Sequence, residues 1–197
     1  MEKDDVMTES KVHDALVDYN RLYTYSDYIK WDDDIRRELI DGVPYVIAGA
    51  NSRHQGVLTN LFLPLGNHLK GKSCKVYVAP FDVRLNAETL DNTVVQPDIL
   101  VFCDHSKLDY ASFKGAPELV VEILSPSTAR YDKITKFNKY LESGVREYWI
   151  VDPENKSLAV NILDDGKYIT HAYTENDIVK VHVLEGCTID LAEVFEE

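Results

Sequence analysis

The spacing of apolar residues changes along the chain from a helical period to a strand period. Between residues 57 and 65 apolar side chains recur every three or four positions, which is typical of a helix with one buried face. Ser52 and Gln55 predict a capping box at the start of this helix, and Pro64 is expected to bend or end it. From residue 74 onward the pattern predicts strands at residues 75–80, 82–85, 94–103 and 118–124.

The dipeptide Asp41-Gly42 divides residues 36–47 into two apolar-rich segments. Both central positions of a two-residue hairpin turn need a positive φ, so this dipeptide predicts a β-hairpin. Val43, Tyr45 and Ile47 alternate with other residues in the second strand, which predicts one buried face. Asp165-Gly166 predicts another turn, in an antiparallel C-terminal meander that ends in a short helix near residues 191–195.

A nearly continuous apolar run at residues 119–124 predicts a central strand that is covered on both faces. A helix is expected next, over residues 130–142, with Gly144 as its C-terminal cap, and a further strand follows at residues 145–151. Together these elements predict one α/β domain with a mixed sheet. The helix has two stripes at helical spacing: Ile134, Phe137 and Leu141, which we expect to face the core, and Asp132, Lys136 and Tyr140.

The composition is that of an ordinary globular protein. The 197 residues are 45% hydrophobic and 28% charged, which allows a substantial core and excludes a disordered chain. We expect an acidic N-terminal extension at residues 1–22 and one domain at residues 23–197. No apolar run approaches the roughly 20 residues of a membrane span, and the N-terminus does not have the chemistry of a signal peptide, so a cytoplasmic protein is expected.

Cysteine usage gives an expectation about redox state. Cys74, Cys103 and Cys187 are odd in number, far apart in the sequence and without a CxxC motif. This pattern predicts reduced thiols in a cytosol and argues against a disulfide framework.

The chain is strongly acidic. It has 21 lysine and arginine residues and 34 aspartate and glutamate residues, so its net charge is 21 − 34 = −13. Such a chain is a poor general binder of nucleic acid, because its own field repels the phosphate backbone. The balance reverses at residues 126–140, where four basic residues accompany one aspartate, a sum of +3. A phosphate backbone could dock there, and the alternative is a solvated helix face.

Two carboxylates lie in or beside predicted apolar strands. Glu122 interrupts an apolar run, where its charge is costly unless it is paired, hydrogen-bonded or bound to a cation. Asp98 follows Pro97 and opens the apolar segment 99–102. On neighbouring strands the two carboxylates would form a site for a hard cation such as Mg²⁺. The alternative is that each is a strand-end carboxylate satisfied by a backbone amide or an arginine.

Several motifs follow one another in an order that resembles the Uma-two family of putative restriction endonucleases. The resemblance covers roughly residues 23–195. In chain order the motifs are Glu38-Leu39-Ile40-Asp41-Gly42, Ser52-Arg53-His54, Asp82-Val83-Arg84-Leu85, Val95-Gln96-Pro97-Asp98, the segment from Ala116 through Glu122-Ile123-Leu124-Ser125-Pro126-Ser127-Thr128, Asp132-x3-Lys136-x3-Tyr140, and the segment from Gly144 through Glu147-Tyr148-Trp149-Ile150-Val151-Asp152-Pro153.

The resemblance implies a restriction-endonuclease-like PD-(D/E)XK fold, which is α/β with a mixed central sheet flanked by helices. It makes Asp98 the aspartate of the PD element and Glu122 the acidic residue that follows. Leu124 stands where the simplest pattern has its lysine, two residues after Glu122. The resemblance places this role at Lys136 on the next helix, and our helix prediction leaves Lys133 open as the alternative.

The resemblance also implies a function, that of a Mg²⁺-dependent endonuclease (a hydrolase) that cleaves phosphodiester bonds in DNA, with Mn²⁺ as an alternative ion. Asp98, Glu122 and the backbone carbonyl of Ile123 would hold the ion. Lys136 would orient the attacking water or offset the developing charge. The alternative is a nuclease fold that no longer cuts and serves as a nucleic-acid-binding or protein-interaction module.

Other residues are assigned around this set. Glu38 would add another carboxylate, and His54 would position a water or phosphate unless it is a structural histidine at a helix start. Tyr140 is expected to pack beside Lys136, and we place Asp82 outside the site. Nuclease folds often pair so that two sites address two strands, so a homodimer is expected by analogy.

Overall fold

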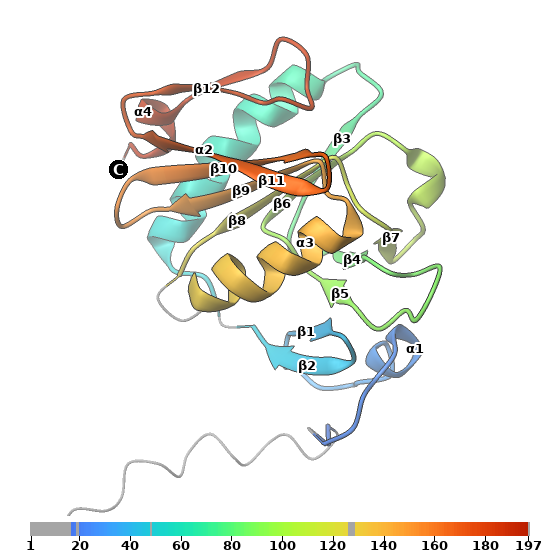
Figure 1. The fold of residues 1–197 in the computed structure, drawn as a ribbon. Coiled ribbons are helices and arrows are strands. Elements are labelled where there is room, and N and C mark those ends of the chain that lie inside the picture. Colours follow the sequence, from blue (N-terminus) through green and yellow to red (C-terminus); the bar gives the residue numbers. More distant parts are fainter. Residues whose placement is uncertain (1–16, 19, 48, 126–128, 197) are drawn as a thin grey trace, which may run out of the picture.

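The computed structural model describes residues 17–18, 20–47, 49–125 and 129–196. A six-stranded mixed sheet forms its centre, with helix α2 (Ser52–Leu69) on one face and helix α3 (Phe137–Ser143) on the other (Figure 1). Most of the predicted acidic extension lies outside the described residues, as do residues 126–128 of the Ser-Pro-Ser-Thr motif. No helix in the described ranges is both long and apolar enough to cross a membrane.

The central sheet has the strand order β11-β10-β9-β8-β6-β3. β8 and β9 are parallel neighbours joined by the segment that contains α3, whereas the other neighbouring strands are antiparallel. The strands are β3 (Lys75–Val78), β6 (Ile99–Phe102), β8 (Leu119–Ile123), β9 (Glu147–Asp152), β10 (Ser157–Asp164) and β11 (Lys167–Thr174).

A five-stranded sheet with the order β2-β1-β5-β4-β7 packs against the α3 side of the central sheet, because side chains of both sheets share one apolar cluster. Its strands are β1 (Arg37–Ile40), β2 (Val43–Val46), β4 (Asp82–Arg84), β5 (Val94–Val95) and β7 (Ser112–Lys114). The remaining elements are α1 (Tyr25–Tyr28), the 3-10 helix His105–Lys107, β12 (Ile178–Lys180), β13 (Thr188–Asp190) and α4 (Leu191–Val194).

Strand β8 is buried on both faces, as its apolar run predicts. Leu119, Val121 and Ile123 belong to the apolar cluster that includes α2, whereas Val120 packs in the cluster on the α3 side. Because successive strand side chains point to opposite faces, Glu122 shares the α3 face with Val120. A carboxylate therefore points from a covered central strand toward the helix that follows it.

The predicted hairpin is confirmed as β1 and β2, and both turn residues, Asp41 and Gly42, have positive φ values of 51° and 82°. Gly42 is also required by space, because an added Cβ atom would lie 3.0 Å from the Cβ atom of Leu22. The expected burial of the second strand is wrong. Tyr45 and Val46 are both exposed, since their strand ends at the edge of a cavity.

The structure also corrects local predictions about element boundaries. Asn51, not Ser52, is the N-cap of α2, and its side chain accepts a hydrogen bond from the His54 backbone N–H. Pro64 does not end the helix, because it lies inside α2, which continues to Leu69. The segment 94–103 forms two strands, β5 and β6, which belong to different sheets and are separated at residues 96–98.

The expectation of reduced thiols is wrong for two of the three cysteines. Cys74 and Cys103 form a disulfide, whereas Cys187 is a buried free thiol. The cause is strand register, because β3 and β6 are antiparallel with Lys75 opposite Phe102. One position further along this ladder, the two cysteines face each other despite their separation of 29 residues in the sequence.

The predicted helix over residues 130–142 is confirmed, and Phe137 of its expected core stripe packs against the apolar cluster on the α3 side, but Ile134 does not. The helix begins with a π-helical segment (Tyr131–Lys136), continues as α3 and ends at Gly144, which has a left-handed φ of 82°. Ile134, predicted to face the core, is 53% exposed. The buried stripe is the polar one, Asp132, Lys136 and Tyr140.

Candidate active site

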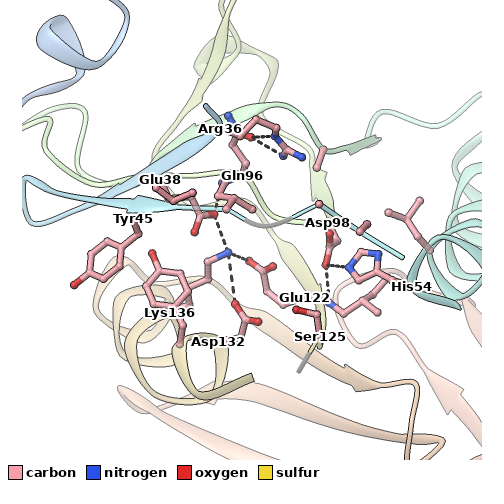
Figure 2. Close-up of a pocket in the computed structure, with 18 of the residues that line it drawn as sticks. Arg36, Glu38, Tyr45, His54, Gln96, Asp98, Glu122, Ser125, Asp132 and Lys136 are labelled. Carbon is pink, nitrogen blue, oxygen red and sulfur yellow. Dashed lines mark hydrogen bonds and ion pairs between the residues drawn. The ribbon is translucent and has the colours of Figure 1, made fainter. Parts of the chain in front are cut away.

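The sequence-predicted site residues line one cavity of about 620 Å³ (Figure 2). The cavity lies where the β1–β2 hairpin, the first turn of α2, the ends of β6 and β8, and the π-helical segment meet. The predicted residues that line it are Glu38, His54, Asp98, Glu122, Ile123 and Lys136.

Lys136 lies at the centre of a buried group of charges (Figure 2). Its Nζ atom is 2.7 Å from Oε1 of Glu38, 2.8 Å from Oε1 of Glu122 and 3.7 Å from Oδ1 of Asp132. None of these four side chains is more than 5% exposed. One ammonium thus contacts three carboxylates, and with all four groups ionised their sum is 1 − 3 = −2.

Helical spacing and strand position together bring these groups to one point. Asp132, Lys136 and Tyr140 follow at four-residue intervals and therefore share one helix face. Tyr140 is fully buried and donates a hydrogen bond of 2.6 Å to Oε1 of Glu122. Glu38 on β1 accepts a 2.7 Å hydrogen bond from the backbone N–H of Gln96. Both acceptors of the Lys136 ammonium are therefore fixed by other parts of the fold.

Asp98 and His54 form the other side of the cavity. Ile99 pairs with Val121 in the antiparallel β6–β8 ladder, so one further step brings Asp98 opposite Glu122. Oδ2 of Asp98 accepts a 2.7 Å hydrogen bond from the backbone N–H of Ile123 and lies 3.2 Å from Nε2 of His54. The two predicted carboxylates therefore lie on the same side of the sheet and open into the same cavity (Figure 2).

Burial and neighbouring charges shift the pKa values of Lys136, Glu122 and His54 in this cavity. Burial lowers the pKa of Lys136, but Glu122, Glu38 and Asp132 outweigh it and hold this pKa well above its usual value. Burial raises the pKa of Glu122 well above its usual value, with opposition from Lys136. Burial lowers the pKa of His54, but the hydrogen bond and charge of Asp98 reverse this and leave it raised. Lys136 is therefore an ammonium at neutral pH.

The donor set suits a small hard cation. The described hydrogen bonds of Glu122 involve Oε1 and those of Asp98 involve Oδ2, so Oε2 and Oδ1 make none within the described residues. No group of three or more His, Cys, Asp or Glu side chains in the described ranges is arranged to hold a metal. Mg²⁺ is usually bound by one or two carboxylates together with waters and substrate phosphates, and the carboxylates of Asp98 and Glu122 both line this cavity.

Comparison with known proteins identifies the family. The model of the Uma2 family, described as "putative restriction endonuclease", matches residues 25–192. The chain belongs to the Uma2 family. Among its relatives in Synechocystis sp., the uncharacterized protein slr1290 is 29% identical over 157 residues, which are 77% of this chain and 80% of the relative. The uncharacterized protein sll1609 is 28% identical over 143 residues, covering 70% and 78% of the two chains.

A solved structure confirms the fold class. The crystal structure of a putative nuclease of the DUF820 group from Anabaena variabilis superposes on this Uma2 protein with a TM-score of 0.71. The match covers 88% of this chain and 97% of that chain at 16% sequence identity. At this identity the likeness shows the fold, which is the restriction-endonuclease-like fold that the sequence motifs imply.

The structure brings Lys136, and not Lys133, to the carboxylates. The side chain of Lys133 is 51% exposed, and its Nζ atom lies 4.0 Å from Asp152. Lys139 pairs with Asp41 at 2.8 Å and with Glu142 at 2.7 Å. Three of the four basic residues in the predicted phosphate-docking segment thus face carboxylates of the protein itself, which weakens that segment as an electrostatic dock for DNA.

Sequence reasoning underrated two residues of the site. Asp132 belongs to the Asp-x3-Lys-x3-Tyr motif but received no role, although it lies 3.7 Å from the Lys136 ammonium. Tyr140 is expected only to pack beside Lys136, and it also donates a hydrogen bond to Glu122. The signal for both was their four-residue spacing from Lys136, which places three polar side chains on one helix face.

Asp82 lies in a polar network next to the cavity but does not line it. Its Oδ1 atom accepts hydrogen bonds from Nε2 of Gln96 at 2.9 Å and from the Tyr28 hydroxyl at 3.2 Å. Burial raises the pKa of Asp82 above its usual value, although these two hydrogen bonds lower it. In Asp82→Asn an amide oxygen can accept the same hydrogen bonds without titrating.

We expect Asp82→Asn to become more stable relative to the wild type as the pH rises. A carboxyl group with a raised folded-state pKa favours folding below its unfolded pKa of about 4 and loses this contribution as the pH rises through the folded pKa. Urea denaturation at pH 4 and pH 7 measures the difference in free energy of unfolding between the two proteins. An equal difference at both pH values would contradict the expectation.

Proposed function

We propose that this Uma2 protein is a Mg²⁺-dependent endonuclease that hydrolyses phosphodiester bonds in DNA. The observation that carries the proposal is the buried ammonium of Lys136 beside Glu122, with Asp98 in the same cavity. The family description supports a restriction-endonuclease-like activity, and the protein from Anabaena variabilis with the same fold is described as a putative nuclease.

Each group in the cavity has a role in this proposal. Asp98, Glu122 and the carbonyl of Ile123 would hold the divalent cation, for which Mn²⁺ is an alternative. Such a cation polarises a phosphoryl oxygen and lowers the pKa of a water molecule. The Lys136 ammonium would donate hydrogen bonds to the attacking water or offset the charge that develops on the phosphoryl oxygens.

Surrounding groups would keep these side chains in place. Tyr140 donates a hydrogen bond to one oxygen of Glu122, and the other oxygen would be the one to hold the cation. Glu38 fixes the position of the Lys136 ammonium at 2.7 Å. His54 orients the Asp98 carboxylate at 3.2 Å, so we assign it a positioning role.

Cleavage of plasmid and branched DNA tests the proposal. Purified protein is incubated with each substrate in Mg²⁺, in Mn²⁺ and in EDTA, alongside Glu122→Ala protein purified in the same way. We expect cleavage that requires the metal and is lost in Glu122→Ala. Cleavage that persists in Glu122→Ala would come from a contaminating nuclease. A wild-type protein that cleaves neither substrate with either metal would reject the proposal.

Two observations favour the alternative of a nuclease fold that no longer cuts and serves as a nucleic-acid-binding or protein-interaction module. The Lys136 ammonium is already paired with carboxylates of the protein, and the chain has a net charge of −13. Calorimetry with Mg²⁺ and DNA, run beside the cleavage assay, separates the two functions. Tight DNA binding without turnover supports the alternative, whereas metal-dependent cleavage rejects it.

A further inference from the structure

Two tyrosine rings lead from the buried ammonium to the mouth of the cavity. The Nζ atom of Lys136 lies 5.5 Å from the centroid of the Tyr131 ring. The Tyr131 ring packs on the Tyr45 ring, with centroids 4.9 Å apart and planes inclined by 33°. Tyr45 is 37% exposed and lies on the opposite side of Lys136 from Asp98 (Figure 2). The cavity thus has an aromatic wall that begins at the catalytic group and reaches solvent.

The wall beside these rings is apolar. Val46 of β2 and Ile134 of the π-helical segment also line the cavity, and both are exposed. The hairpin strand that was expected to be half buried therefore presents an aromatic and an aliphatic side chain to the cavity. Such a surface is suited to the flat face of a ligand that is itself aromatic.

The charges of the cavity argue against recognition by many phosphate contacts. Four carboxylates line it, and the arginine and lysine residues among the described lining residues are Arg36, Arg130 and Lys136, the last already ion-paired. Proteins that bind intact duplex DNA rely on many such phosphate contacts. A substrate bound in this cavity would therefore gain from contacts other than those between basic side chains and phosphates.

We propose that Tyr45 and Tyr131 form a stacking platform for an unpaired nucleobase of the substrate strand, so that single-stranded or branched DNA is bound in preference to intact duplex. The inference rests on the proposed nuclease function and adds the class of substrate to it. In a duplex the base faces are covered by their neighbours, and exposing one costs unpairing and unstacking energy. An unpaired base carries no such cost, and stacking tolerates any base sequence.

Fluorescence of a base analogue tests the platform directly. A DNA strand with one 2-aminopurine is titrated with protein in Ca²⁺, both as a single strand and annealed to its complement. We expect quenching of the 2-aminopurine fluorescence and tighter binding for the single strand. Tyr45→Ala should weaken single-strand binding by roughly 5- to 100-fold and remove the quenching, because a stacked base is lost. Tyr45→Phe should retain both, because it keeps the ring.

Tyr110→Ala is the matched control, because Tyr110 is fully exposed and does not line the cavity. Binding of Tyr45→Ala equal to that of the wild type, or equal affinity for single strand and duplex, would overturn the inference. Glu122-dependent cleavage that is unaffected by Tyr45→Ala would reject the platform and leave the nuclease function standing. Tyr45-dependent quenching without cleavage in Mg²⁺ or Mn²⁺ would support the platform and reject the nuclease function.

Discussion

Replacing Lys136 by methionine is expected to lower the rate of DNA cleavage by about 10²–10³-fold, because the charge that offsets the developing negative charge is lost. The same change should lower the free energy of unfolding by about 3–5 kcal/mol, because Glu38, Glu122 and Asp132 then remain buried without a counter-ion. Single-turnover cleavage measures the first effect, and urea denaturation at neutral pH measures the second.

Lys133→Met is the matched control, since this lysine is on the same helical segment but is exposed. We expect at most about 1 kcal/mol of destabilisation and unchanged cleavage from it. The double variant Glu122→Gln with Lys136→Met should be more stable than the sum of the two single changes predicts, by about 0.5–3 kcal/mol, because one uncompensated charge is gone. Additive effects in this cycle would mean that the ion pair does not stabilise the fold.

Features that depend on neighbouring residues were predictable from the sequence. The Asp41-Gly42 and Asp165-Gly166 turns form as expected, because all four residues adopt the positive φ that the hairpin needs. Gly144 ends its helix for the same reason. The resemblance to the Uma-two family implied one site with Asp98, Glu122 and Lys136, and all three line the same cavity, whereas the helix prediction alone left Lys133 open.

Features that depend on distant partners were not predictable. Hydrophobicity alone assigns Ile134 to the core, but carboxylates on β1 and β8 give the Lys136 ammonium buried partners, so Lys136 is buried and Ile134 is exposed. The Cys74–Cys103 disulfide depends on the register between β3 and β6, which the spacing of cysteines in the sequence does not contain. The break after Val95 likewise arises because the chain leaves one sheet and enters another.

Replacing Asp98 by asparagine is expected to weaken Mg²⁺ or Mn²⁺ binding by at least about 10-fold and to slow cleavage accordingly, because the amide would remove a charged oxygen from the proposed cation site. Stability should change little. In the wild type, the backbone N–H of Ile123 donates a 2.7 Å hydrogen bond to Oδ2 of Asp98. An asparagine side-chain oxygen can still accept this hydrogen bond. Calorimetric titration of the free protein with Mn²⁺ measures the affinity without any contribution from DNA.

A titration of cleavage with Mg²⁺ distinguishes a carboxylate that binds the metal from one with a structural role only. Cleavage by Asp98→Asn should recover as Mg²⁺ increases, with its midpoint shifted to higher concentration than in the wild type. Asp82→Asn is the control, because Asp82 is also a partly buried aspartate, hydrogen-bonded to Gln96, but does not line the cavity. The Mg²⁺ concentration at half-maximal cleavage should be the same for Asp82→Asn as for the wild type. If the Mg²⁺ midpoint shifts equally in both variants, a general loss of negative charge explains the effect. If neither shifts, Asp98 does not hold the cation.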